Sequence, residues 1–362
     1  MVTPLRSLTL PTVSKLARER DAPLEDFLLM ALNVDGIRYA SDDGEEPGFH
    51  RGRFLFRPLG ATRSFIATSL SEDTPFRHDG CRILLGGVPI GDATPIENDT
   101  CEDTYLRKGG TVLSLNSNNK SACAGCAFCG AYSLEAREET LTDGERLDRK
   151  VRELIRASGK SDISHLESIG VVTGCFRSEE EAFGHLLLVR GVFGNHGFRG
   201  EINYLGSQIT SPWAIDALAR DGRYGLYLTV ECFDRRERFL RPSKAAVSLD
   251  RGRNILHYAK SQGLETTFLY ILGLDPLERI AEEFPKYVGT LTRHPIVNLL
   301  QIYTPRQTAV RHPDAMGFEY YLDGRSIIEE AMAPTGLRPR TWENYRAPWA
   351  TRYRGEPLEH II

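Results

Sequence analysis

Three cysteines within seven residues constrain this chain more than any other feature of its sequence. They are Cys123, Cys126 and Cys129, and two residues separate each neighbouring pair. This spacing does not place three side chains on one face of a helix, so it favours a loop that turns its thiolates towards one centre. The alanines and glycine in the gaps let the backbone curl closely. Soft thiolates at this spacing suit an iron–sulfur cluster or zinc.

The number of available ligands separates these two metal centres. Both usually take four ligands, and this stretch supplies three. No second CxxC pair and no HxxxH pair occurs, and His165 and His185 stand alone. A structural zinc site is closed by four protein ligands, whereas an iron–sulfur cube held by three cysteines keeps one iron open. Zinc, an electron-transfer cluster and reduced structural thiols remain alternatives.

Composition excludes several classes of protein. The chain has 362 residues, 41% of them hydrophobic, and a formal net charge of −4. Its length allows one large domain and a smaller one, and its charge does not indicate nucleic-acid binding. No apolar run approaches a membrane span, and the N-terminus has no signal-peptide core. Seven cysteines, an odd number with three clustered, argue against a disulfide framework and predict a cytoplasmic protein.

Residues 1–108 differ from the rest of the chain in their pattern of apolar residues and glycines. They are expected to form a small N-terminal α+β domain. Apolar residues recur at helical intervals from Val13 to Leu32. Short apolar runs separated by glycines follow, which indicates strands and turns. Cys81 and Cys101 lie in this region, and we expect core residues there rather than ligands of an auxiliary cluster. The domain is either a plain structural unit, or a lid or substrate-binding module.

From Gly109 onward, short apolar strands alternate with helix-sized segments. The predicted strands are 111–115, 169–173, 201–205, 226–230, 266–272 and 296–303, and a charged helix is predicted from 138 to 157. Such alternation predicts βα units and a parallel sheet. Six units are fewer than the eight of a closed barrel, so we expect either a partial (β/α)6 TIM-type barrel over 109–305 or an open doubly wound sheet. Residues 306–362 are expected to form a C-terminal extension that closes the barrel.

In parallel α/β folds the ligand binds at the carboxyl ends of the strands. These ends carry, in chain order, the cysteine loop, Thr173, Gly174 and Cys175, then Ser207, Glu231 and Cys232, then Ile271, Gly273 and Tyr303. The thiols of Cys175 and Cys232 are candidate catalytic groups, because a thiol can donate a hydrogen atom or carry sulfur. The alternative is that both are buried small hydrophobes, as free cysteines usually are.

The cysteine stretch, with Phe128 before its last cysteine and Gly130 after it, resembles the radical S-adenosylmethionine (radical SAM) superfamily. The usual family spacing is C-x3-C-x2-C, one residue longer in the first gap. Glu231, the Leu240-Arg241-Pro242 segment and an arginine at the start of the next helix resemble the biotin-synthase-like branch. The resemblance covers roughly residues 109–305 and favours the partial barrel.

The resemblance implies a 4Fe–4S cluster on the three cysteines, with the amino and carboxylate groups of SAM on the open iron. Glu231 would bind polar groups of SAM, and Arg253, or Arg251 in the other register, would pair with its carboxylate. The implied cofactor-binding set is Phe128, Thr173, Gly174, Ser207, Glu231, Arg253, Ile271, Gly273 and Tyr303. Without the resemblance, Glu231 and the arginines would be ordinary surface ion pairs.

The implied activity is reductive cleavage of SAM to methionine and a 5′-deoxyadenosyl radical, which abstracts hydrogen from a small polar metabolite in a biosynthetic reaction. An external donor such as flavodoxin or ferredoxin would supply the electron. The alternatives are a radical SAM enzyme that inserts sulfur or a methyl group, and a non-enzymatic iron–sulfur or zinc protein.

Overall fold

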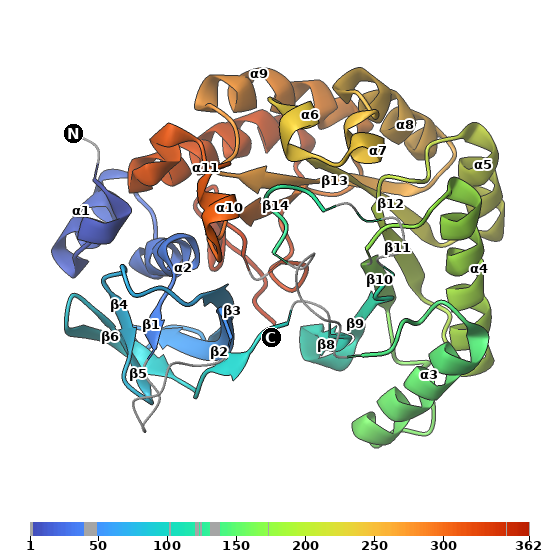
Figure 1. Ribbon diagram of the computed structural model, residues 1–362, viewed down its shortest axis with the longest axis horizontal. Coiled ribbons are helices and arrows are strands. Elements are labelled where there is room, and N and C mark those ends of the chain that lie inside the picture. The colour runs from blue at the N-terminus through green and yellow to red at the C-terminus, as the bar shows by residue number, and fades with distance from the viewer. Residues whose placement is uncertain are drawn as a thin grey trace.

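The computed structural model describes residues 3–39, 49–100, 103–119, 123, 125–130, 138–172, 174–344 and 346–361. Two of the residues discussed above, Cys101 and Thr173, lie outside these ranges. Figure 1 shows an N-terminal α+β part beside a curved sheet wrapped by helices, with the C-terminal segment between them. None of the helices in the described ranges is long and apolar enough to cross a membrane.

The sheet formed by β8 to β14 is an open half-barrel in the strand order β14-β13-β12-β11-β10-β9-β8. Its six strands from β9 to β14 pair in parallel, which confirms the parallel sheet predicted from the alternating pattern. Every residue of the central strand β12 is buried, because helices cover one side and the barrel interior lies on the other. The bounds are β9 Val112–Asn116, β10 Ser168–Val172, β11 Glu201–Gly206, β12 Tyr224–Glu231, β13 Glu265–Leu272 and β14 Ile296–Leu299.

One strand of this sheet was not predicted. Strand β8, Tyr105–Arg107, runs antiparallel to β9 at the edge of the sheet. It lies before residue 108, where we predicted the boundary between the N-terminal domain and the barrel. Three residues are too few to show a periodic pattern, so only pairing with β9 reveals this strand.

Helices cover the convex side of the half-barrel (Figure 1). Side-chain caps fix several of their starts. Asp143 accepts a hydrogen bond from the Arg146 N–H, and Ser178 accepts one from Glu181. The predicted helix from 138 therefore begins only after the cap at Asp143. The bounds are α3 Gly144–Ser158, α4 Glu179–Asn195, α5 Pro212–Asp221, α6 Arg236–Phe239, α7 Pro242–Ala245, α8 Leu249–Ser261, α9 Leu277–Tyr287, α10 Pro305–Thr308 and α11 Phe318–Met332.

The N-terminal part consists of two helices and a small mixed sheet, as the α+β prediction requires. The helices, α1 Leu10–Glu19 and α2 Leu24–Asp35, are separated at Asp21, which has a φ of 47°, and at Pro23. Cys81 is exposed, so the expectation of a core residue was wrong. The strands are β1 Arg38–Tyr39, β2 Arg51–Pro58, β3 Ser64–Ser69, β4 Phe76–His78, β5 Arg82–Leu85, β6 Val88–Ala93 and β7 Glu97–Asn98.

One hydrophobic core cluster joins the N-terminal part to the half-barrel and to α11. The rings of Phe27 in α2 and Phe318 in α11, for example, meet edge to face at 6.1 Å. Beside them, Asp26 accepts hydrogen bonds from Arg325 Nη1 at 3.1 Å and from the Thr351 backbone N–H at 2.7 Å. The carboxylate of Asp26 is fully buried. The N-terminal part is therefore tied to the C-terminal third of the chain by packing and by charge.

We expect Asp26→Ala to lower the free energy of unfolding by about 3–5 kcal/mol, because it leaves the buried Arg325 guanidinium without this partner. Urea denaturation followed by circular dichroism measures the loss. Asp323→Ala is the matched control, since Asp323 pairs with Arg20 where the side chains are 45% and 30% exposed; it should cost less than about 1 kcal/mol. Equal losses in the two variants would contradict this account.

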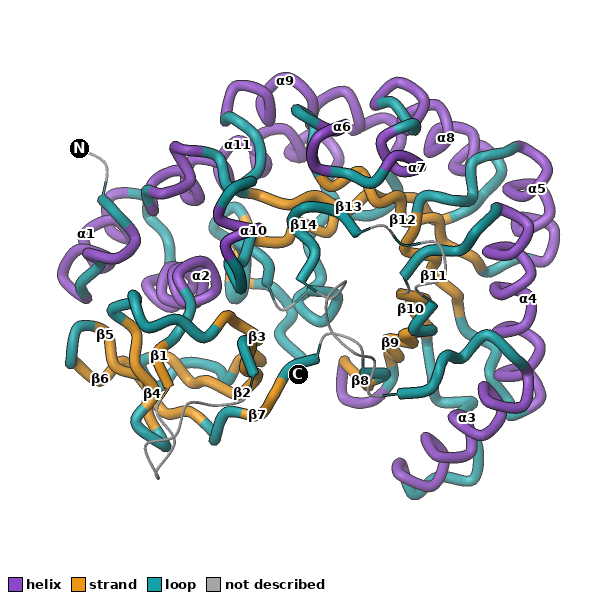
Figure 2. Tube along the Cα trace, viewed as in Figure 1, coloured by secondary structure: helices purple, strands orange, loops and turns teal. Residues whose placement is uncertain are grey.

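The C-terminal segment after α11 reaches across the gap between the two edges of the half-barrel (Figure 2). At one edge, Asn344 Nδ2 donates to the Val297 carbonyl of β14 at 2.6 Å. At the other, Arg107 Nη1 of β8 donates to the Trp342 carbonyl at 3.0 Å. A short hairpin of β15 Arg352–Tyr353 and β16 Glu356–Pro357 follows. The segment thus bridges β14 and β8, which do not pair with each other.

Candidate functional site

The cysteine loop follows β9 and lies at the carboxyl end of the parallel sheet. Cys126 is buried in an apolar cluster with Cys232, Ile271 and Leu300, and Phe128 packs against this cluster. The Ala127 N–H donates to the Phe239 carbonyl of α6 at 2.8 Å. The fold therefore brings part of the predicted site together around the loop.

The three thiols are close in sequence but do not converge on one point in this conformation. Within the described ranges, no group of three or more His, Cys, Asp or Glu side chains is arranged to hold a metal ion. Cys126 is buried, whereas Cys123 and Cys129 are partly exposed. Binding a cluster would require the loop to close and bring the three sulfur atoms together.

Cys175 lies against the cysteine loop. Its backbone N–H donates to the Asn119 carbonyl at 2.6 Å, and its thiol forms a hydrogen bond with the Cys123 sulfur. That hydrogen bond lowers the pKa of the Cys123 thiol, with support from the Gly125 N–H and the Arg241 charge. The same contact and burial raise the pKa of Cys175. A lowered pKa favours the thiolate of Cys123, the form that binds metals.

Cys232 has a different environment. It is fully buried, and burial, with the nearby carboxylate of Asp275, raises the pKa of its thiol. A neutral, enclosed thiol is a poor nucleophile and a poor metal ligand. The geometry supports Cys175, rather than Cys232, as the additional thiol that can act at the cysteine loop.

Glu231 ends β12 in a strained conformation next to a buried cation. Its φ is 69°, and the pairing with β13 is irregular between Thr229 and Glu231. Such conformations in residues other than glycine cost about 1–3 kcal/mol and cluster at functional sites. Glu231 Oε1 accepts a hydrogen bond from Lys244 Nζ at 2.9 Å. Burial opposes the charged form of Lys244, but Glu231 and Cys126 outweigh it and raise the pKa of the Lys244 ammonium.

Arg241 is the main site residue that the sequence-based prediction missed. Its positive charge lies near the thiols of Cys123 and Cys175. This charge acts to lower the pKa of each thiol. Only 4% of the residue is exposed. Its Nε and Nη1 atoms are buried and have no hydrogen-bond partner among the described residues. A buried cation with unused donors is costly unless an anion meets it, so this guanidinium is arranged to receive one.

Arg253 does not lie at this site. Its guanidinium pairs with Glu283 of α9 at 2.9 Å and with Asp250, and stacks over the Tyr287 ring. Arg251, the alternative register, points to the Thr210 hydroxyl at 3.4 Å. Arg253 thus contacts α9, and Arg251 contacts the loop before α5. The Leu240-Arg241-Pro242 segment was noted in the sequence as part of the family resemblance. The sequence does not reveal that two short helices, α6 and α7, turn Arg241 towards the cysteines.

The remaining candidates lie at the carboxyl ends of the strands, as predicted. Ser207 is 7% exposed after β11, and Gly174 follows β10. Gly273 after β13 has a φ of 124°, and a Cβ atom there would lie 2.7 Å from the Leu300 Cβ. Only glycine permits this approach. Together with Ile271, these residues line the same edge of the sheet as the cysteine loop.

Tyr303 links the cysteine loop to the N-terminal part. A Cβ atom on Gly130 would lie 2.8 Å from the Tyr303 ring, so this ring covers the backbone beside Cys129. The Tyr303 hydroxyl donates to Gln301 Oε1, and Arg51 of β2 lies over the ring at 5.2 Å. The N-terminal part therefore reaches the wall of the site.

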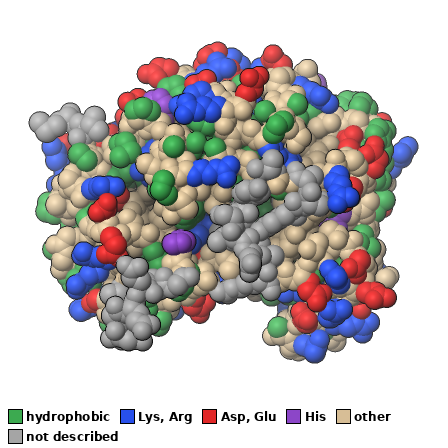
Figure 3. Space-filling view, in the orientation of Figure 1, with side chains coloured by type: hydrophobic (Ala, Val, Ile, Leu, Met, Phe, Trp, Pro, Cys, Tyr) green, Lys and Arg blue, Asp and Glu red, His purple; other side chains and the backbone are tan. Residues whose placement is uncertain are grey.

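The residues present suit an iron–sulfur cluster chemically. Three thiols, one of them with a lowered pKa, lie with an apolar shell and two cations, Arg241 and Lys244, that compensate negative charge. A separate anion could also bind at this site, on the unused donors of Arg241. On the face seen in Figure 3, the described acidic and basic side chains are interspersed rather than gathered by sign.

No protein-family model and no curated protein matches this sequence. Solved structures with a similar fold include Streptococcus suis SuiB bound to S-adenosylmethionine, at 14% identity and a TM-score of 0.39, over 54% of this chain and 42% of SuiB. Another is the radical S-adenosylmethionine methyltransferase TsrM from Kitasatospora setae, with cobalamin and a 4Fe–4S cluster bound. It is 15% identical with a TM-score of 0.41, over 59% of this chain and 41% of TsrM. The matched region spans less than half the length of either protein.

Proposed function

We propose that this chain is a radical SAM enzyme in which Cys123, Cys126 and Cys129 hold a 4Fe–4S cluster. The observation that carries the proposal is Arg241, a buried guanidinium with unused donors beside a three-cysteine loop at the carboxyl end of a parallel sheet. When bound, the reduced cluster supplies the electron that cleaves SAM and yields a 5′-deoxyadenosyl radical. The protein's part is to bind, orient and shield the reactants.

In this proposal Arg241 replaces Arg253 as the partner of the SAM carboxylate. A guanidinium offers two parallel N–H donors that match a carboxylate. Glu231, held by Lys244, accepts hydrogen bonds from the SAM amino or ribose groups. The adenine ring is placed beside Ile271 and the backbone of Gly273.

The remaining assignments complete the proposal. Thr173 and Gly174 approach the SAM amino group, and Ser207, Phe128 and Tyr303 enclose the cofactors. The half-barrel is assigned as a partial (β/α)6 barrel over residues 109–305, with the C-terminal extension closing its open side. A cytoplasmic location and an external donor such as flavodoxin or ferredoxin follow from this chemistry.

Hydrogen abstraction from a bound metabolite is the proposed reaction. Methyl transfer is the second candidate, and an open position on the cluster is compatible with both. A non-enzymatic cluster protein is the third, but the unused donors of Arg241 argue against it, because purely electron-transferring proteins need no anion site.

Anaerobic reconstitution with iron and sulfide, followed by electron paramagnetic resonance (EPR) of the reduced protein with and without SAM, tests the proposal. We expect a cubane signal that changes on addition of SAM, and 5′-deoxyadenosine detected by mass spectrometry. A cluster indifferent to SAM would support electron transfer instead, and bound zinc without iron would reject the radical mechanism.

Cys175 is expected to tune the cluster rather than to hold it. Hydrogen bonds to cluster sulfurs raise the reduction potential, so Cys175→Ala should lower the potential while iron content stays unchanged. A redox titration followed by EPR measures the shift, and Cys232→Ala is the matched control with an unchanged potential. Loss of iron in Cys175→Ala would instead make this residue a ligand.

A further inference from the structure

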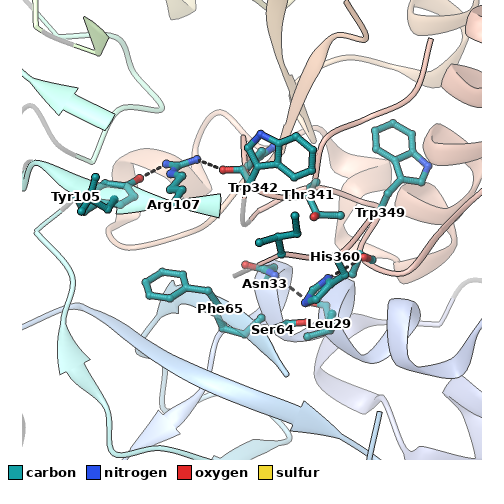
Figure 4. A pocket seen from close by; sticks show the side chains of 16 residues that line it. Leu29, Asn33, Ser64, Phe65, Tyr105, Arg107, Thr341, Trp342, Trp349 and His360 are labelled. Carbon is teal, nitrogen blue, oxygen red and sulfur yellow. Dashed lines mark hydrogen bonds between the residues drawn. The ribbon is translucent and has the colours of Figure 1, made fainter. Parts of the chain in front are cut away.

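A second cavity lies outside the cysteine site, where the N-terminal part, β8 and the C-terminal segment meet (Figure 4). Its enclosed space is about 110 Å³, similar in scale to an engineered apolar cavity of about 150 Å³ that binds benzene. Residues far apart in the sequence form its walls, among them Leu29, Phe65, Leu106, Trp342 and Trp349.

The walls of this cavity, which we call the junction cavity, are apolar and aromatic. Most of the polar groups that reach it form hydrogen bonds within the protein. Asn33 donates to the Leu29 carbonyl at 3.0 Å and accepts from Gln301 at 3.1 Å, and Arg107 donates to the Trp342 carbonyl. Apolar and aromatic side chains therefore provide most of the surface that a ligand contacts. The lining selects a neutral, ring-containing group.

One polar atom of the lining is not engaged. The Ser64 hydroxyl, at the start of β3, belongs to a residue that is 5% exposed, and it has no hydrogen-bond partner in the described part of the chain. Figure 4 shows Ser64 beside Leu29 on the cavity wall. A buried hydroxyl without a partner costs about 1–3 kcal/mol. A ligand with one donor or acceptor would recover this cost, which gives the cavity a fixed point for orienting its occupant.

Hydrogen bonds and packing connect the junction cavity to the cysteine loop. From Asn33 in the lining, they run through Gln301 to the Tyr303 hydroxyl, and the Tyr303 ring lies against Gly130. Gln301 also donates to the Ala67 carbonyl at 2.6 Å, which fixes the amide between the two sites. Three side chains, Asn33, Gln301 and Tyr303, thus connect the cavity to the loop.

We propose that the junction cavity is a recognition site for a neutral aromatic group with one hydrogen-bonding atom, carried by the substrate. The role as substrate recognition rests on the proposed radical SAM function, whereas the binding itself does not. From the sequence we expected a small polar metabolite as the substrate. The junction cavity would instead bind an apolar, aromatic part of the substrate. The anchor could be a free aromatic compound or an aromatic residue of a peptide, and the two sources share this chemistry.

Isothermal titration calorimetry of the full chain tests the binding with three probes: indole, N-acetyltryptophanamide and indole-3-acetate. We expect one neutral probe molecule to bind per chain and the charged acetate to bind at least about tenfold more weakly. Tighter binding of indole indicates a free compound, and tighter binding of the amide indicates a peptide residue. Equal binding of the charged probe would overturn the proposal.

Two variants locate the site. Ala350→Leu fills the cavity and should weaken the neutral probe by at least about tenfold, and Ser64→Ala should weaken it by about fivefold through the lost hydrogen bond. Trp213→Ala is the control, because Trp213 is 45% exposed on α5, outside this cavity. Unchanged affinity in both cavity variants would reject the site. If Ala350→Leu fails to fold, as judged by circular dichroism, Ser64→Ala still decides the question.

Failure of this proposal is distinguishable from failure of the proposed function. The titration needs neither cluster nor SAM, so probes can bind to a chain that never forms 5′-deoxyadenosine. Conversely, SAM cleavage without probe binding would keep the enzyme assignment and remove only the aromatic anchor.

Discussion

Replacing Cys126 with alanine is expected to abolish cluster binding and every SAM-dependent reaction of this chain. Three thiolates from one loop are the proposed protein ligands, and two are not enough to hold a cube with one open iron. Changes in outer-shell partners of a metal site cost 10–100-fold, so removing a ligand should lower 5′-deoxyadenosine formation by more than about 100-fold. Iron and sulfide analysis and the EPR signal of the reduced protein measure the loss.

Cys81→Ala is the matched control for this experiment. Cys81 is an exposed cysteine between β4 and β5, and its thiol contacts only the nearby Asp79 among the described hydrogen bonds. Its replacement should leave iron content and activity unchanged. A full cluster in Cys126→Ala would contradict the ligand assignment, and loss of iron in Cys81→Ala would point to a second cluster.

Arg241→Gln is expected to weaken SAM binding by about 2–5 kcal/mol, which corresponds to a factor of about 30 to several thousand in Kd. The reason is the loss of a buried cation whose Nε and Nη1 donors have no partner among the described residues. Binding of SAM to the reconstituted protein, measured by equilibrium dialysis, gives the affinity. Stability should not fall, because the change removes a buried charge whose donors lack partners.

Two further arginine variants sharpen this test. Arg253→Gln should leave SAM affinity unchanged and lower stability instead, because Arg253 pairs with the buried Glu283. Arg241→Lys keeps the charge without the two-pronged geometry and should fall between wild type and Arg241→Gln. If Arg253→Gln weakened SAM binding more than Arg241→Gln did, the original prediction from the sequence would be restored.

Local patterns located most of the half-barrel. The strands around Ile169, Ile202 and Phe268 were found within a few residues, because buried parallel strands are short apolar runs between helical segments. The helix start near Glu138 was misplaced, since a charged stretch before the Asp143 cap shows no periodicity that would exclude it. Strand β8 was missed because its only support is pairing with β9.

Some residues of the candidate site could likewise be predicted from the sequence, and others could not. Thiolate chemistry and spacing identified the cysteine loop, and the rule for strand ends identified Glu231 and Cys175. The arginine that we propose for anion binding, Arg241, was not selected from the sequence, because the distance from β12 along the chain does not tell which way a guanidinium turns. In the structure α6 and α7 turn Arg241 towards Cys123, while α8 carries Arg253 towards α9.

The sequence by itself determined the chemistry that this chain can perform and the alternation of its strands and helices, since both depend on neighbouring residues. Tertiary structure decided which distant side chains meet. Only folding places Asp26 against Arg325, Tyr303 against Gly130, and Ser64 in a cavity closed by the C-terminal segment. Such contacts depend on how layers pack around a shared core, and no local period in the sequence records that packing.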